Sequence, residues 1–214
     1  MNRRGFFSSL FGTEPESFFF GVQIVFLTLS GDDTGNRLRH LIAEASAYDN
    51  ATEKPSEKLA LYKQIITILL EQKPHWEYGY WDYITESDEA SNEAEFDSWV
   101  SEITASMATE HEELGTSNDE AFRMSSDKYY ITVTMAFLLE YPPLERTRTL
   151  LDNIPEDEYW THAGFAELCE AIRRIDFEYA LRDAVFVMPG NDDDGFSWED
   201  LHGAGWDYLK PLSL

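Results

Sequence analysis

Large apolar residues occupy every odd position from Tyr129 to Leu139, and Thr132, Thr134 and Ala136 stand among the positions between them. This alternation with a period of two, in β-branched and aromatic residues, predicts a β-strand with one face against a hydrophobic core. Residues 18–29 and 183–188 are also rich in apolar residues and are followed by turn sequences. We expect these three segments to form one sheet, with residues 129–139 in its middle.

Apolar residues recur at steps of three and four between the predicted strands, which is the spacing of amphipathic helices. The pattern predicts helices over residues 36–48, 56–73, 92–107, 144–151 and 160–175. Helical connections between strands favour crossovers over hairpins. The expected fold class is α+β, with a small three-stranded mixed β-sheet packed with about five to six α-helices in a single domain. The odd face of residues 129–139 should then contact the apolar helix stripes at Leu59, Ile66, Phe165 or Ile172.

The chain divides into a short tail and one domain. We expect residues 1–16 to be a flexible N-terminal tail and residues 17–214 to be a single α+β domain, in which residues 110–127 form an acidic loop, ordered or disordered. The apolar run at residues 18–29 is too short to cross a bilayer as a helix, so we expect no stable membrane span. A weak membrane contact by the tail stays an open alternative, through Phe6, Phe7, Leu10 and Phe11 with Arg3 and Arg4.

The charge of the chain limits its partners. The 214 residues carry a formal net charge of −25, from 16 Lys and Arg against 41 Asp and Glu. Such a field repels phosphate, so we expect no nucleic-acid partner. Between Pro74 and Phe122 there is no Lys or Arg, but there are fourteen carboxylates. This segment is either a solvated surface or a docking face for a protein partner with a basic surface.

The sequence carries no recognisable catalytic or metal-binding motif. Its five histidines are far apart, and Cys169 is the single cysteine, so no intramolecular disulfide forms. Cys169 lies on an apolar helical stripe, which predicts a buried, inert thiol. The acidic run that ends at Gly195 does not fit an EF-hand, because position 12 of the loop would be Leu201. We expect no cofactor, no metal, no catalytic residue and a cytoplasmic location.

The most unusual local composition lies at residues 75–83, where five of nine residues are aromatic and acids stand between them. One interpretation is a latch, in which the rings fold over the end of the helix at residues 56–73. The other is a recognition patch, because Trp and Tyr are enriched at interface hot spots. The candidate partner-binding residues are Trp76, Tyr78, Tyr80, Trp81, Glu77 and Asp82.

Several short segments suggest a family. They are the strand at residues 22–29, the run from Leu69-Leu70 to Pro74-His75-Trp76-Glu77-Tyr78-Gly79, the strand at residues 130–134, and residues 168–175 and 197–212. Their order resembles the domain-of-unknown-function family 1517, found mainly in cyanobacteria and plant chloroplasts. The resemblance covers about residues 20–212, and it implies an α+β domain without known catalytic residues.

These observations lead to one preferred function and two alternatives. We expect an acidic, soluble, non-enzymatic protein-interaction domain that binds its partner through residues 75–113. The first alternative is an acidic inhibitor or immunity-type protein that plugs the basic active site of its partner. The second is an enzyme of unknown class, which would need a deep polar pocket with perturbed titratable groups.

Overall fold

The structure, a computed structural model, describes residues 17–29, 32–48, 54–85, 89–116, 128–190, 201 and 206–214. The α+β class and the predicted number of helices are confirmed, but the three-stranded mixed sheet is wrong. In the described chain, five strands form one sheet of order β4-β3-β1-β2-β5, and every neighbouring pair is antiparallel. The elements in chain order are β1 (Ser17–Leu29), α1 (Thr34–Ser46), α2 (Pro55–Glu71), β2 (Trp76–Ile84), α3 (Glu89–Thr116), β3 (Lys128–Glu140), α5 (Glu145–Asp152), α6 (His162–Ile172), β4 (Ala180–Met188) and β5 (Lys210–Pro211).

The centre of the sheet is the long antiparallel pair of β1 and β3. Their register runs from Ser17 opposite Glu140 to Leu29 opposite Lys128. β1 is apolar on both faces because helices cover both sides of the sheet, so neither face of the strand meets water. Within this pair Val133 of β3 lies opposite Ile24 of β1, and both side chains are fully buried.

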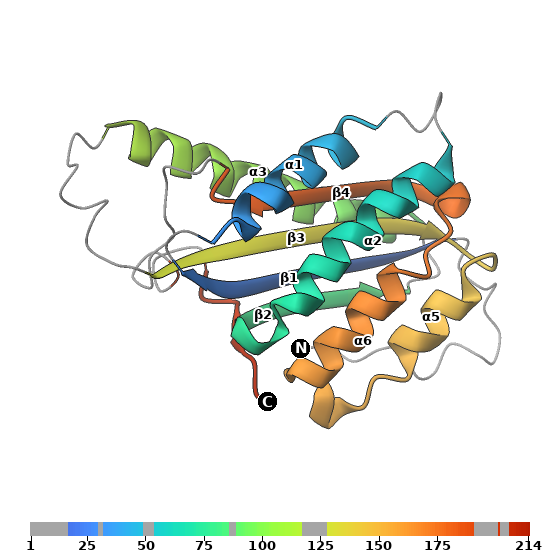
Figure 1. Cartoon of the computed structure of the whole chain (residues 1–214). Helices are drawn as coiled ribbons and strands as arrows, with labels where there is room; N and C mark the ends of the chain where they lie inside the picture. The colour runs from blue at the N-terminus through green and yellow to red at the C-terminus, as the bar shows by residue number, and fades with distance from the viewer. Residues whose placement is uncertain are drawn as a thin grey trace.

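Helices cover the two faces of the sheet unequally. In Figure 1, α1, α2, α5 and α6 lie on one face, and α3 lies behind the sheet on the other. The first face holds the larger core, in which the odd residues of β3 share one hydrophobic cluster with Ile66, Phe165 and Ile172, as predicted. Gly79 of β2 allows α6 to approach closely, because a Cβ there would collide with the Phe165 ring.

The second face is smaller and partly polar. α3 packs Phe96 and Trp99 against Phe19 of β1 and against Ala136 and Leu138 of β3. The opposite end of this face is covered by the C-terminal segment, where Leu201 packs with Val25. Between these two apolar clusters the sheet presents buried polar side chains, namely Gln23, Thr132 and Thr134. A cavity can form at this buried polar strip, between α3 and the C-terminal segment.

The expected crossovers between adjacent strands are also wrong, for a geometric reason. Two helices connect β1 to β2, and two α-helices connect β3 to β4, so each connection returns the chain to the end of the sheet that it left. Neighbouring strands therefore run antiparallel. The single helix α3 joins strands of the same direction, β2 and β3, which lie on either side of β1.

The predictions of an acidic loop and of an N-terminal tail have different outcomes. α3 continues to Thr116, so residues 110–116 are helical and not part of a loop. The rest of the predicted acidic loop, residues 117–127, and the N-terminal tail with its candidate membrane contact lie outside the described residues. In the part of the chain that is described, no helix is both long and apolar enough to cross a membrane.

Candidate functional site

A cavity of about 560 Å³ lies on the second face of the sheet, between α3 and the C-terminal segment. Its volume falls within the range of small-molecule sites, roughly 300–1,000 Å³. The lining residues come from four elements and the C-terminal segment: Gln23, Tyr80, Glu95, Ser98, Trp99, Glu102, Ile103, Ala105, Met188, Trp206 and Tyr208. Aromatic rings and carboxylates therefore dominate its wall.

α3 supplies one side of the cavity through residues on a single helical face. Glu95, Trp99 and Glu102 are spaced by four and three residues, so they project in the same direction. Trp99 also packs on Phe19, with ring centroids 5.5 Å apart. Gly21 provides the space for this ring, since a Cβ at position 21 would lie 2.8 Å from Trp99 atoms. The glycine thus allows α3 to place its tryptophan directly on β1.

Tyr80 of β2 is the central ring of the cavity. It stacks on Trp99 at a centroid distance of 5.6 Å and meets Tyr208 edge-on at 5.3 Å. Trp206 stacks on the far side of Tyr208 at 6.3 Å. Such contacts between aromatic rings hold each ring in a fixed orientation. The four rings therefore form a preorganised aromatic wall.

Three carboxylates concentrate negative charge at this wall. Burial raises the pKa of Asp82, an effect partly offset by the backbone N–H of Tyr83, which donates to Asp82 Oδ1 at 2.8 Å. Burial and then the charges of Asp82 and Glu102 raise the pKa of Glu95. Burial and the same acids also raise the pKa of the Tyr80 hydroxyl, because all of them oppose a further negative charge.

The floor of the cavity contains an unsatisfied polar group. Gln23 is 2% exposed, and its Oε1 accepts a hydrogen bond from the Tyr208 hydroxyl at 2.8 Å. Its Nε2 has no hydrogen-bond partner among the described residues. Burial, offset in part by this hydrogen bond, raises the pKa of Tyr208 to about 12, so the phenol remains a donor at neutral pH. The Gln23 amide nitrogen is the free donor at the floor.

The predicted site residues separate onto the two faces of the sheet. Trp76 is 3% exposed, and its Nε1 donates to the Leu69 carbonyl at 3.1 Å, so it belongs to the core of the first face. Trp81 points to the same face and donates to the Tyr159 carbonyl at 3.1 Å. These two tryptophans are therefore fixed by internal contacts, and Trp76 is not available to a partner.

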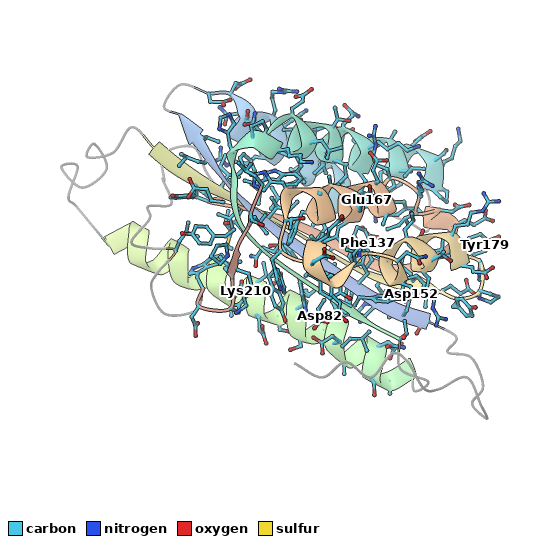
Figure 2. All side chains as sticks on the ribbon, turned by 90° about the horizontal axis from the view of Figure 1, so that it is seen from below. Asp82, Phe137, Asp152, Glu167, Tyr179 and Lys210 are labelled. Atoms are coloured by element: carbon cyan, nitrogen blue, oxygen red, sulfur yellow. The ribbon has the colours of Figure 1, made fainter. Side chains whose placement is uncertain are left out.

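The other four candidates lie toward the second face. Glu77 accepts a hydrogen bond from the Tyr130 hydroxyl at 2.9 Å, and Tyr78 packs beside Tyr130 in the cluster around Val25. Tyr80 lines the cavity, and Asp82 lies close enough to it to shift its pKa; Figure 2 labels Asp82 beside α3. The aromatic segment is a β-strand whose rings alternate between the two faces, and the latch interpretation holds for Trp76, which donates to Leu69 near the end of α2.

Sequence reasoning missed most of the cavity. Glu95, Trp99 and Glu102 carried a usable signal, because their spacing puts two acids beside a tryptophan on one helical face. Gln23 also stood out as a polar residue in an otherwise apolar strand. No signal in the sequence connects Gln23 with Tyr208, which are 185 residues apart.

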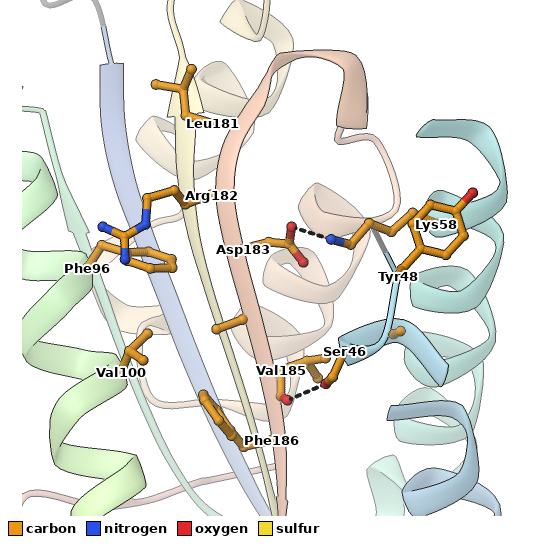
Figure 3. A pocket seen from close by; sticks show the side chains of 12 residues that line it. Ser46, Tyr48, Lys58, Phe96, Val100, Leu181, Arg182, Asp183, Val185 and Phe186 are labelled. Carbon is orange, nitrogen blue, oxygen red and sulfur yellow. Dashed lines mark hydrogen bonds and ion pairs between the residues drawn. The ribbon is translucent and has the colours of Figure 1, made fainter. Parts of the chain in front are cut away.

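A second cavity, of about 460 Å³, lies along the edge strand β4 (Figure 3). Phe96 and Val100 approach it from α3, and Lys58 approaches from α2. Lys58 Nζ and Asp183 Oδ1 are 2.6 Å apart, and both side chains are buried. The Tyr62 hydroxyl donates to the other carboxylate oxygen at 2.7 Å. Because both oxygens of Asp183 have a partner, this group is a closed structural network rather than an open site.

Two further features of the chain bear on its chemistry, namely its cysteine and its potential metal ligands. Cys169 is buried, and burial raises the pKa of its thiol to about 12, so it stays protonated and inert as predicted. In the described part of the chain, no three His, Cys, Asp or Glu side chains gather as metal ligands. Neither the cysteine nor a metal centre among the described residues therefore adds a reactive group to the cavity.

Comparison of the chain with family models, with curated proteins and with solved structures found no match. The resemblance to family 1517 therefore stays a prediction. The chemistry of the cavity on the second face is therefore the basis for inferring a function.

Proposed function

We propose that this protein is a non-enzymatic interaction domain that binds a basic protein partner through the surface formed by β2, α3 and the C-terminal segment. The observation that carries the proposal is that Tyr80, Glu95 and Glu102 line one cavity, with Asp82 close enough to contribute to the raised pKa of Tyr80. No Lys or Arg is found among the described residues that line the cavity. A cation from a partner would relieve the repulsion between these acids, which favours binding of a positive group.

Binding is favoured over catalysis by the composition of the wall. Carboxyls with raised pKa values are also what acid–base catalysis uses, as the enzyme alternative requires. However, four of the eleven described lining residues are aromatic, and aromatic rings supply contact area and bind cations. The Ser98 hydroxyl donates to Glu102 Oε1 at 3.2 Å, but both residues are exposed. The described lining holds no His, Lys or Cys, so we infer no reaction here.

A lysine-rich peptide tests the proposal by isothermal titration calorimetry at low and moderate salt. The wild-type protein should bind the peptide, and the affinity should fall as salt rises, because exposed charges are screened. The double variant Glu95→Gln/Glu102→Gln should bind at least about tenfold more weakly, which corresponds to about 1.4 kcal/mol.

The matched control is Glu167→Gln/Glu178→Gln, which removes the same charge from exposed positions on α6 and after it, on the first face. This control should keep nearly the full affinity. If the two double variants lose affinity equally, net charge alone attracts the peptide, and the proposed surface is wrong.

A further inference from the structure

The cavity on the second face combines three features that rarely occur together. Tyr80, Trp99 and Tyr208 present aromatic rings, Glu95 and Glu102 add negative charge, and a buried amide donor lies at the floor. Each feature selects a different property of a ligand. Together they restrict the ligand more narrowly than charge attraction does.

The rings select an alkylated cation over a bare ammonium. A primary ammonium is compact and strongly hydrated, so it loses much hydration energy when it enters an aromatic cavity. An alkylated ammonium spreads its charge over methyl groups, which contact ring faces and are held by cation–π attraction. Tyr80 and Tyr208 pack edge to face at an interplanar angle of 77°, and both line the cavity, so a rounded cation there can contact rings of different orientation.

Glu95, Glu102 and the Gln23 amide at the floor of the cavity set two further requirements for the ligand. Glu95 and Glu102 line the cavity with the rings; both charges raise the pKa of Tyr80, and that of Glu102 also raises the pKa of Tyr208, so negative charge lies close to both rings. Gln23 Nε2 is a buried donor without a partner in the described chain, which is a costly state that a ligand oxygen would relieve. The ligand should therefore carry an acceptor near its cation.

We propose that this cavity binds an alkylated ammonium group next to a hydrogen-bond acceptor, with the cation in the cavity against the rings of Tyr80, Trp99 and Tyr208 and the acceptor at Gln23. The group belongs either to a free amino alcohol such as choline, whose hydroxyl is the acceptor, or to a partner that presents a methylated lysine side chain beside a carbonyl or hydroxyl of another of its residues. This inference rests on the proposed function, since it uses the same acids, but its test needs no protein partner.

Calorimetry with small probes tests the chemistry. Choline should bind, whereas 3,3-dimethylbutanol, its uncharged analogue of the same shape, should bind at least about tenfold more weakly. Tyr80→Phe should keep choline binding, and Tyr80→Leu should lose it, because the ring face and not the hydroxyl holds the cation. Glu102→Gln is an exposed substitution that cannot disturb the core, and it should weaken choline binding severalfold.

The floor is tested separately with Gln23→Met. Choline should bind more tightly than tetramethylammonium to the wild-type protein, and Gln23→Met should remove this preference while tetramethylammonium binding persists. Equal binding of choline and its uncharged analogue, or unchanged binding by Tyr80→Leu, would overturn the inference.

A peptide series separates the two sources and separates this inference from the proposed function. If choline binds and a trimethyllysine peptide does not, the ligand is a free amine; if the trimethyllysine peptide binds more tightly than its unmodified form, it is a side chain. Charge-dependent binding of the unmodified peptide without any preference for methylation, and no choline binding, would refute the alkylated ligand and leave the interaction domain standing. Loss of all binding would refute both.

Discussion

Replacing Lys58 with methionine should strongly destabilise the protein, because it would leave the Asp183 carboxylate buried without its cation. The side chains of Lys58 and Asp183 are 5% and 4% exposed, and their charged atoms are 2.6 Å apart. Removal of one partner from a buried ion pair costs about 3–5 kcal/mol. Since small proteins are stable by only about 5–15 kcal/mol, the loss should be a large fraction of the total.

The double variant Lys58→Met/Asp183→Asn tests the cause of this loss. Asparagine removes the buried charge but still accepts a hydrogen bond from the Tyr62 hydroxyl, which donates to Asp183 in the wild type. The second substitution should therefore restore part of the stability that the first one removed. Urea unfolding of the wild type, both single variants and the double variant gives the coupling energy between the two sites.

A surface pair provides the control. Arg182 and Asp97 are 2.7 Å apart, but their side chains are about half exposed. Asp97→Asn should cost about 0–1 kcal/mol, the usual worth of an exposed ion pair. If Lys58→Met cost no more than Asp97→Asn, or if the double variant were less stable than Lys58→Met alone, the account of this network as a buried charge pair would be wrong.

Three further outcomes follow from the core and the cavity. Glu95→Gln should raise the thermal midpoint at pH 7. The pKa of Glu95 is higher in the folded state than in the unfolded state, where it is about 4.3. The stability of the wild-type protein therefore falls as pH rises from the unfolded-state pKa through the folded-state pKa, and glutamine removes this loss. The gain should vanish in melts below pH 4, and a gain that persists there would have another cause. Val133→Asp should leave the domain unfolded by circular dichroism, because it buries an unpaired charge at a fully buried position in the middle of the sheet; an unchanged midpoint would contradict that position. Gly21→Ala should cost about 1–3 kcal/mol in urea unfolding and weaken choline binding, because its Cβ would displace the Trp99 ring. Gly190→Ala, with nothing within 4 Å of a new Cβ, should change neither property.

Three strands could be predicted because their sequences reflect burial directly. β1, β3 and β4 consist largely of β-branched, aromatic and aliphatic residues. β2 escaped detection because aromatic residues point to both faces, Tyr80 to the cavity and Trp81 to the core, so no polar face reveals the alternation. Gly79 added to the error, since it suggests a turn from sequence but actually allows α6 to approach.

Long-range proximity could not be predicted at all. Helix α3 was shortened in the prediction because residues 110–116 are polar, although most of them have high helix propensity. The acids of the cavity were visible as charge but not as neighbours of Tyr80. Their meeting depends on strand order, which places β2 beside β1 and brings Tyr208 to Gln23. Local sequence patterns carry no information about the order of the strands in the sheet.

The pairing of β1 with β3 has a consequence for synthesis on the ribosome. β1 leaves the ribosome before its main partner β3, which extends to Glu140. At about 5–20 residues per second, the segment in between takes on the order of ten seconds to be made. During this delay a strand that is apolar on both faces has only β2 to shield one of its edges. The nascent chain therefore presents a binding segment for holdase chaperones, and we expect synonymous codons that slow translation before β3 to lower the yield of folded protein without changing its final stability.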